Sequence, residues 1–292
     1  MRYRTPDQEH LSREQLLAAE VVEHNEEYAG RHHFPFGLTS MRMQKDEVLR
    51  INDHAYKQGA YMRGYRKRRL FELLDLKSLD GQRVLDAGCG NGQHAVFFAM
   101  FGAFASGFDL SDVGIETARE MAIANNVQGL CEFQVGNASE MPYPDDHFDV
   151  IVLNAVLHHM LKYPKIREEA FRVLRPGGRL FITEGLRENP IYRVLRGAIL
   201  RVKGGAPDQG DVDLGLDDLI SFAEGFEEVH REHFCLFEGI KAGIARPYAN
   251  PLAIRIVLFL ATRVDNVVLM MLPGLSRYCS EVVMTMRKPH PQ

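Results

Sequence analysis

The sequence predicts an α/β fold in which a mostly parallel sheet carries helices on both faces. Two observations support this prediction. Between residues 81 and 185, short apolar runs typical of buried strands alternate with stretches of helical character. The first run also leads into a glycine-rich turn that opens a helical stretch. Such alternation indicates successive βαβ units, which place parallel strands in one sheet with the helices packed against it.

These elements follow one another in a regular order. The predicted strand segments are RVLDAG (83–88), ASGFDLS (105–111), CEFQVGNA (131–138), FDVIVLNAV (148–156) and GGRLFITEG (177–185). The helical stretches among them are AVFFAMFG (95–102), ETAREMAIANN (116–126) and IREEAFRVL (166–174). Ligands of such sheets bind at the carboxyl ends of the strands, so the residues that follow each strand are the candidates for a functional site.

Both flanks of this region have a different pattern. Residues 1–80 are polar and rich in helix formers, so we expect a helical N-terminal extension or lid, followed by one domain over residues 81–292. The predicted elements of the C-terminal third are a helix at 217–224 and strands at 227–237 and 281–287. Between those strands lies an apolar helical insert, about residues 238–279, which is much longer than an ordinary hairpin connection and therefore suggests a function.

Composition narrows the class of protein. A chain of 292 residues with 46% hydrophobic content can fill one sizeable α/β core with additions. The net charge of −4 provides no overall field for a polyanion, so we expect no nucleic-acid partner. The four cysteines lie far apart with no CxxC pair, which fits neither a disulfide framework nor a zinc site. With no apolar signal segment at its N-terminus, the chain is expected to be cytoplasmic.

The glycine-rich turn is the first functional feature. Asp86 ends the first strand, and Gly88, Gly90 and Gly92 follow within six residues, so the backbone can turn tightly and approach a ligand closely. The helix that follows offers unpaired N–H groups to an anion. We expect Asp86 to face the ammonium and carboxylate end of an amino-acid-like ligand.

A dinucleotide site is the competing interpretation of this turn. The segment GNGQHA (90–95) also satisfies G-x-G-x-x-A, and Asp109 lies nearly twenty residues further on. The charge of Asp86 distinguishes between the two kinds of ligand. Asp86 would face a pyrophosphate with like charge, whereas a zwitterionic, sulfonium-bearing ligand tolerates a carboxylate. We therefore favour the second kind of ligand.

Two later strand ends carry further candidates. Asp109 closes the second strand, where a carboxylate can accept hydrogen bonds from both hydroxyls of a ribose. Asn137 and Ala138 end the third strand, where a side-chain amide can bond the adenine amino group, although Asn137 is equally explained as a turn residue.

The motifs VLDAGCGNGQ, GFDLS, MPYPDDHFDVIVLNAVLHH and LRPGGRLFITE, in this order, resemble those of class I S-adenosylmethionine-dependent methyltransferases, especially the small-molecule branch of the ubiquinone and sterol enzymes. The resemblance covers about residues 80–185. It implies a Rossmann-like, seven-stranded sheet with an antiparallel C-terminal hairpin, S-adenosylmethionine as cofactor, S-adenosylhomocysteine as product and no metal. The family often has Asp where Asn137 stands. The cofactor-binding residues expected in this chain are Asp86, Gly88, Cys89, Gly90, Gly92, Asp109, Leu110, Asn137, Ala138 and Asn154.

Catalysis needs a general base only for some acceptors, because the sulfonium already activates the methyl group. His158 and His159 follow the fourth strand, and an imidazole titrates near neutrality, so either can deprotonate a hydroxyl or an acidic carbon. The alternative is that the pair only supports the loop. The other polar candidates are Glu184, Arg187 and His94.

The flanks are expected to cover the acceptor. Aromatic residues of the extension that can form a lid are Tyr28, Phe34, Phe36, Tyr61 and Tyr65. The basic run at 63–69 is compatible with RNA contact, but a solvated helix face explains it as well. Residues 253–272 approach transmembrane length, yet Arg255, Arg263 and Asp265 argue against a spanning helix.

Two interpretations of the insert stay open. It is a helical cap packed on the sheet or on a second subunit of a homodimer, or it forms a hydrophobic tunnel or a peripheral membrane contact for a lipid-linked substrate. A second basic and apolar segment, residues 191–203, repeats the pattern. The sequence thus predicts methyl transfer to a small-molecule or lipid-like acceptor. The alternatives are an RNA methyltransferase and a non-catalytic cofactor-binding module.

Overall fold

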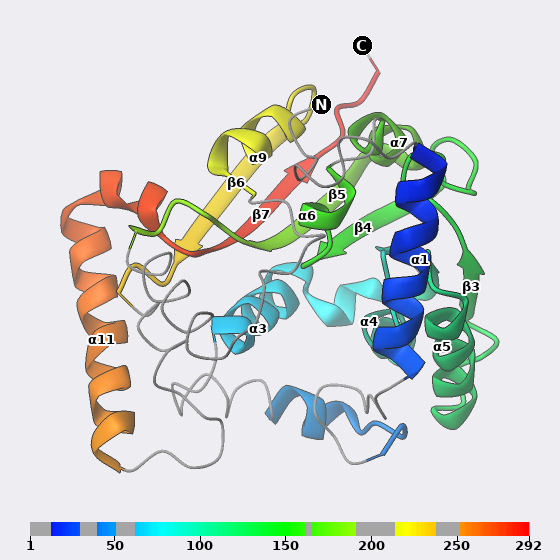
Figure 1. Ribbon diagram of the computed structural model, residues 1–292, viewed down its shortest axis with the longest axis horizontal. Coiled ribbons are helices and arrows are strands. Elements are labelled where there is room, and N and C mark those ends of the chain that lie inside the picture. Colours follow the sequence, from blue (N-terminus) through cyan, green and yellow to red (C-terminus); the bar gives the residue numbers. More distant parts are fainter. Residues whose placement is uncertain are drawn as a thin grey trace.

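The structure is a computed structural model that describes residues 13–29, 40–50, 62–161, 165–190, 214–237 and 252–291. Its centre is a seven-stranded sheet with the order β3-β2-β1-β4-β5-β7-β6 (Figure 1). The strands are β1 (Arg83–Ala87), β2 (Phe104–Asp109), β3 (Cys131–Val135), β4 (Phe148–Asn154), β5 (Leu174–Gly185), β6 (Glu227–Phe234) and β7 (Glu281–Arg287). Strands β1 to β5 are parallel, and β7 is antiparallel to both β5 and β6, so the predicted fold class is confirmed.

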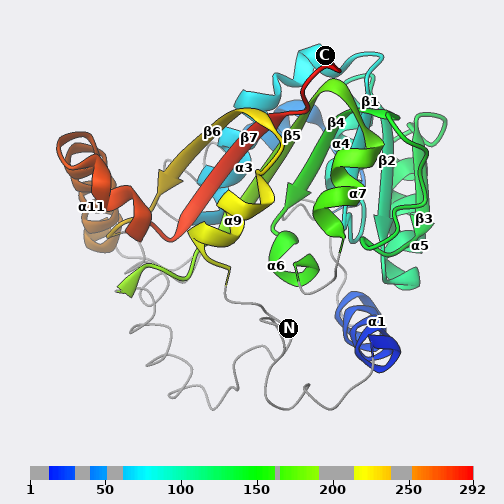
Figure 2. The same ribbon diagram turned by 90° about the horizontal axis from the view of Figure 1, so that it is seen from above.

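Helices cover both faces of this sheet (Figure 2). They are α1 (Arg13–Ala29), α3 (Met62–Leu74), α4 (Gln93–Ala99), α5 (Asp112–Ala124), α6 (Leu157–Met160), α7 (Ile166–Val173), α9 (Leu216–Phe222) and α11 (Leu252–Met271), with 3₁₀ turns η3 (Leu76–Leu79) and η5 (Pro273–Tyr278). Among the described residues, no helix is long and apolar enough to cross a membrane.

The core lies in two layers because successive side chains of a strand point to opposite faces. Val84 of β1 packs with Phe97 and Phe98 of α4, and its neighbour Leu85 packs on the opposite face with Ile151 of β4. All of these side chains are fully buried. The sheet is therefore rigidly held on both faces, and the ends of its strands are the places where side chains can serve a ligand.

The last helix of the N-terminal extension, α3, shares the core of the sheet. Leu70, Phe71 and Leu74 are buried in the layer that contains α4. Two arginines of α3 also form salt bridges with the last two strands of the sheet. Arg69 forms a salt bridge with Glu232 of β6 at 2.6 Å, and Arg66 forms one with Glu281 of β7 at 2.6 Å.

The boundaries of the C-terminal elements differ slightly from the prediction. Strand β6 ends at Phe234 rather than at residue 237, because Cys235 has a φ of 65°, which interrupts the extended backbone. The predicted helix within the insert is present as α11. The basic segment 191–203 and the first part of the insert lie outside the described residues.

Candidate active site

The candidate site lies where the strand order reverses. Strand β1 has β2 on one side and β4 on the other, so the loops after β1 and β4 leave the sheet in different directions. Parallel sheets bind ligands in the crevice outside the carboxyl ends of the strands at such a point. The candidate residues that follow β1, β2, β3 and β4 are therefore brought to one edge of the sheet.

The glycine loop is held against the end of β2. The backbone N–H groups of Gly88 and Cys89 both donate to the carbonyl oxygen of Phe108, at 2.9 and 3.0 Å. Gly90 has a φ of 53°, and a Cβ atom at this position would collide with the hydroxyl of Tyr28 from α1. The loop thus needs glycine at residue 90 both for its conformation and for its close contact with α1.

Asp86 is the most unusual group at this edge. It is buried with 2% exposure, and its Oδ2 atom has no hydrogen-bond partner among the described residues. Burial, with a smaller contribution from the charge of Asp109, raises the pKa of its carboxyl group to about 7, against a hydrogen bond from the backbone of Ala95. A buried carboxylate oxygen without a donor is costly, and a cationic ligand would relieve that cost.

Asp109 is buried at the end of β2, and both of its oxygens accept backbone hydrogen bonds. Oδ2 accepts from the N–H of Gly90 at 2.8 Å, and Oδ1 accepts from the N–H of Ser111 at 3.0 Å. The N-cap of α5 is Ser111, whose side chain accepts from the N–H of Gly114, so capping does not explain Asp109. These two backbone hydrogen bonds hold the carboxylate in place at the carboxyl end of β2.

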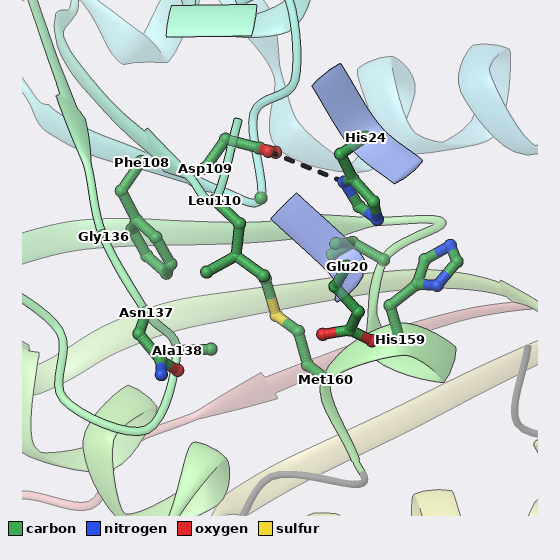
Figure 3. Close-up of a pocket in the computed structure, with 12 residues that line it drawn as sticks. Glu20, His24, Phe108, Asp109, Leu110, Gly136, Asn137, Ala138, His159 and Met160 are labelled. Atoms are coloured by element: carbon green, nitrogen blue, oxygen red, sulfur yellow. Dashed lines mark ion pairs between the residues drawn. The ribbon is translucent and has the colours of Figure 1, made fainter. Parts of the chain in front are cut away.

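A small cavity lies between this edge of the sheet and α1 (Figure 3). It encloses about 30 Å³, room for about two water molecules. The residues that line it are Glu20, His24, Gly88, Phe108, Asp109, Leu110, Gly136, Asn137, Ala138, Val156, His159 and Met160. Sites for drug-sized ligands have volumes of roughly 300 to 1,000 Å³, so this cavity is much smaller than such a site.

Helix α1 covers the cavity with polar side chains. Glu20 and His24 project from α1 toward the sheet in Figure 3, and the Nδ1 atom of His24 lies 3.8 Å from Oδ1 of Asp109. The rings of His24 and His159 meet edge to face at a centroid distance of 5.6 Å. Tyr28, one of the residues expected to form a lid, lies against Gly90. The other expected lid residues, Phe34, Phe36, Tyr61 and the side chain of Tyr65, lie outside the described residues.

Asn137 has the local role of a turn residue and also lines the cavity. Its Oδ1 atom accepts from the N–H of Ser139 at 2.9 Å, and its backbone forms a bridge with Glu140. The oxygen expected to accept from an adenine amino group thus already accepts one hydrogen bond within the turn and keeps its second lone pair. Ala138, its neighbour, is buried at the cavity wall.

The two histidines after β4 have different surroundings. The Nδ1 atom of His158 lies 2.9 Å from Oε2 of Glu184, while Oε1 of Glu184 accepts from the N–H of Leu157 at 2.6 Å. Glu184 is buried, and although burial opposes its ionisation, the hydrogen bond and charge of His158 hold the pKa of this carboxyl below its usual value. A carboxylate that binds Nδ1 leaves Nε2 of the ring as the basic atom. His159 lines the cavity instead.

Asn154 is not among the residues that line the cavity, and its side chain contacts Thr183 and His94. Its Oδ1 accepts from the hydroxyl of Thr183 at 2.7 Å, and its Nδ2 lies 3.5 Å from Nε2 of His94. Burial, together with the charge of Lys67, holds the pKa of His94 well below its usual value, so His94 is neutral. Because the Asn154 oxygen is used by Thr183, the amide donates to His94, which places the imidazole proton on Nδ1.

The structure thus brings some of the site residues expected from the sequence together around one cavity. Gly88, Asp109, Leu110, Asn137, Ala138 and His159 share one cavity. Asp86, Cys89, Gly90, Gly92, Asn154 and His158 lie outside its lining, while Arg187 is exposed and faces Asp218. Sequence reasoning missed Glu20, His24 and Met160. The spacing of Glu20, His24 and Tyr28, each four residues apart, is the signal that could have identified one helix face turned toward the site.

Comparisons with known proteins agree with this geometry. Residues 85–182 match the family described as "Methyltransferase domain". The chain is 39% identical to 27-O-demethylrifamycin SV methyltransferase of Amycolatopsis mediterranei over 119 residues, which cover 40% of this chain and 43% of that protein. It is 36% identical to the ubiquinone/menaquinone biosynthesis C-methyltransferase UbiE of Vibrio campbellii over 107 residues, which cover 36% of this chain and 41% of that protein.

A sterol 24-C-methyltransferase of Gibberella zeae is 32% identical over 162 residues, which cover 53% of this chain and 40% of that protein. The chain therefore spans about two fifths of the length of these curated relatives. Among solved structures, the [4+2]-cyclase SpnF has a TM-score of 0.54 at 20% identity, covering 95% of this chain and 96% of that one. MccD protein has a TM-score of 0.50 at 18% identity, covering 76% of this chain and 96% of that one.

These likenesses establish the fold and the domain. Residues 85–182 match the methyltransferase domain family, and the described sheet shares its fold with the solved structures of SpnF and MccD. The low identity to the solved structures supports the fold alone. Because one of them is named a cyclase, the reaction has to be argued from this chain's own residues.

Proposed function

We propose that this protein transfers the methyl group of S-adenosylmethionine to a small-molecule acceptor. The observation that supports this most directly is Asp86, a buried carboxylate with an unpartnered oxygen beside the glycine loop. A dinucleotide would bring a pyrophosphate to this loop and meet the like charge of Asp86, whereas the ammonium group of S-adenosylmethionine would supply the missing donor.

The residues present fit the cofactor. Asp86 and the loop from Gly88 to Gly92 would hold the methionine part, Asp109 with Leu110 the ribose, and Asn137 with Ala138 the adenine. Helix α1 would close over the bound nucleoside with Tyr28 and His24. The cofactor supplies a methyl group already activated by the sulfonium, so the protein has to orient the acceptor in line with it and exclude water.

His158 is the best placed general base. Its Nδ1 is bound by Glu184, which fixes the ring and favours the tautomer in which Nε2 can accept a proton from an acceptor hydroxyl or acidic carbon. Glu184 is a positioning residue in this scheme, because it acts through the imidazole. His159 faces the cavity and His24, so it would contact the cofactor or the acceptor rather than share the role of Glu184.

The acceptor would lie between the site and the C-terminal insert, since both occupy the carboxyl edge of the sheet. An acceptor with a lipid-like part would use the apolar side chains of the insert, and a homodimer contact is the competing role of the same segment. The proposed reaction uses no metal, because the sulfonium already activates the methyl group.

Two measurements test this function. Calorimetry should show binding of S-adenosylhomocysteine in metal-free buffer and none, or much weaker binding, of NAD. Incubation with methyl-labelled S-adenosylmethionine and pools of small-molecule and lipid extracts should then transfer label to an acceptor. Binding of NAD alone would refute the cofactor assignment. If the protein binds the cofactor but labels no small-molecule or lipid pool, transfer of label to RNA would support the RNA methyltransferase alternative. Absence of transfer to any acceptor, RNA included, would support the non-catalytic alternative.

A further inference from the structure

The C-terminal insert concentrates exposed apolar side chains. In the described part of the chain, seven of the fourteen large hydrophobic residues that are exposed lie between residues 252 and 278. They are Leu260, Val264, Val267, Met270, Met271, Leu272 and Tyr278. The other seven are scattered over α1, β2, α5 and further elements, as is normal for a protein surface. A concentration of this kind on one element marks an interaction surface.

Four of these residues form a continuous stripe along α11. Leu260, Val264, Val267 and Met271 are separated by four, three and four positions, which places them on one face of a helix. Their exposed fractions are 54, 49, 49 and 71%. Met270 and Leu272 extend the stripe at its C-terminal end, with exposures of 77 and 58%. We call this set the α11 stripe.

Charge distinguishes the outer surface of this segment from the rest of the protein. Residues 252–278 contain three arginines and one acidic residue, in a chain whose net charge is −4. The acidic residue, Asp265, is 3% exposed and accepts a hydrogen bond from the N–H of Phe237 at 2.8 Å. Its charge is thus directed into the protein, while Arg263 and Arg277 are exposed. The exposed charged side chains described in this segment are therefore those of Arg263 and Arg277.

The topology places both ends of this insert at the same edge of the sheet as the candidate site. Phe234 at the end of β6 pairs with Glu281 at the start of β7, and Glu281 pairs with Gly185 at the end of β5. The segment that joins β6 to β7 therefore leaves the sheet where the parallel strands end. Figure 2 shows α11 beyond β6, at the opposite side of the molecule from α1.

We propose that α11 docks this protein onto an anionic lipid surface. The α11 stripe would enter the boundary between headgroups and acyl chains, and the exposed arginines would bind the phosphates, as in other basic amphipathic helices. A second copy of the chain fits the same surface less well. Pairing two α11 helices would bring arginines together, and the one acidic residue of the segment is turned inward in each copy.

Vesicle co-sedimentation of the full chain tests this inference. Wild type should bind vesicles of phosphatidylcholine mixed with phosphatidylglycerol, bind vesicles of phosphatidylcholine alone far more weakly, and lose affinity at high salt. Val264→Asp and Val267→Asp should each lower the partition coefficient at least about tenfold, because a charge replaces a buried apolar group. Arg277→Gln should lower it about fivefold, the equivalent of about 1 kcal/mol per arginine.

The matched control is Ile123→Asp. Ile123 is 62% exposed on α5, so the same kind of substitution is made away from the stripe, and vesicle binding should be unchanged. Thermal unfolding of each variant checks that the fold is retained. Absence of wild-type binding to anionic vesicles would overturn the inference, as would equal losses in Ile123→Asp. A dimer in light scattering that Val264→Asp dissociates, without vesicle binding, would assign the surface to a second copy instead. None of these results depends on methyl transfer.

Discussion

Replacing Asp86 by Asn should make the protein more stable and at the same time weaken cofactor binding. The amide has the shape of the carboxylate and keeps an oxygen that can accept from the backbone of Ala95, but it carries no charge. The wild-type carboxylate is buried beside Asp109 without a donor at Oδ2. The folded protein therefore has to ionise this group at a cost that the unfolded chain does not have.

The pKa shift sets the size of the effect. A shift from 3.8 to about 7 is about three units, or about 4 kcal/mol at 1.36 kcal/mol per unit. The pKa of Asp86 is higher in the folded protein than in the unfolded chain. The free energy of unfolding is therefore highest below pH 3.8, where Asp86 is protonated in both states, and it falls as the pH rises to about 7. About 2 kcal/mol of the loss is present at pH 5, so the advantage of the Asp86→Asn variant over the wild type should grow by about 2 to 3 kcal/mol between pH 5 and pH 8.

Urea unfolding of the wild type and of Asp86→Asn at pH 5 and pH 8 measures this difference. Asp145→Asn serves as the control, because the side chain of Asp145 is 74% exposed and its substitution should change stability little at either pH. The affinity for S-adenosylhomocysteine, measured at pH 8, should fall in Asp86→Asn and stay constant in the control. A stability difference that is independent of pH, or a loss of stability at pH 8, would refute the assignment of Asp86 as an uncompensated buried carboxylate.

The remaining predictions concern the other parts of the site. Asp109→Ala should weaken binding of S-adenosylhomocysteine by roughly 1.5–3 kcal/mol in calorimetry, the value of a charged hydrogen-bonded group, and unchanged affinity would remove Asp109 from the site. Gly92→Ala should lower the free energy of unfolding by more than about 1 kcal/mol, because Gly92 has a φ of 74° and the added Cβ atom would lie 2.5 Å from the Cβ atom of Ala118. The control is Gly129→Ala, where an added Cβ atom would have no neighbour within 4 Å. If His158 is the base, His158→Ala should lower turnover about 10²- to 10⁴-fold and remove the acidic limb of the pH profile of turnover, and Glu184→Gln should shift that limb. Near-normal turnover of His158→Ala would exclude His158 as the base. The same measurement on His159→Ala tests the second imidazole. Cofactor binding should slow hydrogen exchange in α1 as well as around Gly88, and protection limited to the glycine loop would show that α1 is not a lid.

Local pattern was sufficient to predict the order and type of the elements. The alternation of apolar runs with helical stretches predicted β1 to β5 and the helices between them, and the glycines at 88, 90 and 92 located the turn after β1. Strand and helix periodicities are properties of a few neighbouring residues, so they are visible in one sequence. The long separation of the last two strands likewise indicated that a helix lies between them.

The chemistry of the site depended on contacts between residues far apart in the chain. Glu184 contacts the Nδ1 atom of His158 from 26 positions away in the chain. The hydroxyl of Thr183 donates a hydrogen bond to Asn154 from 29 positions away. The four-residue spacing of Glu20, His24 and Tyr28 marks one face of α1, but the part of the protein that this face covers is decided by the tertiary structure. The sequence by itself determined which residues end or follow each strand, because strand periodicity is local. Which of them are charged, paired or turned toward a ligand was decided only by the tertiary structure, because burial and long-range hydrogen bonds set those properties.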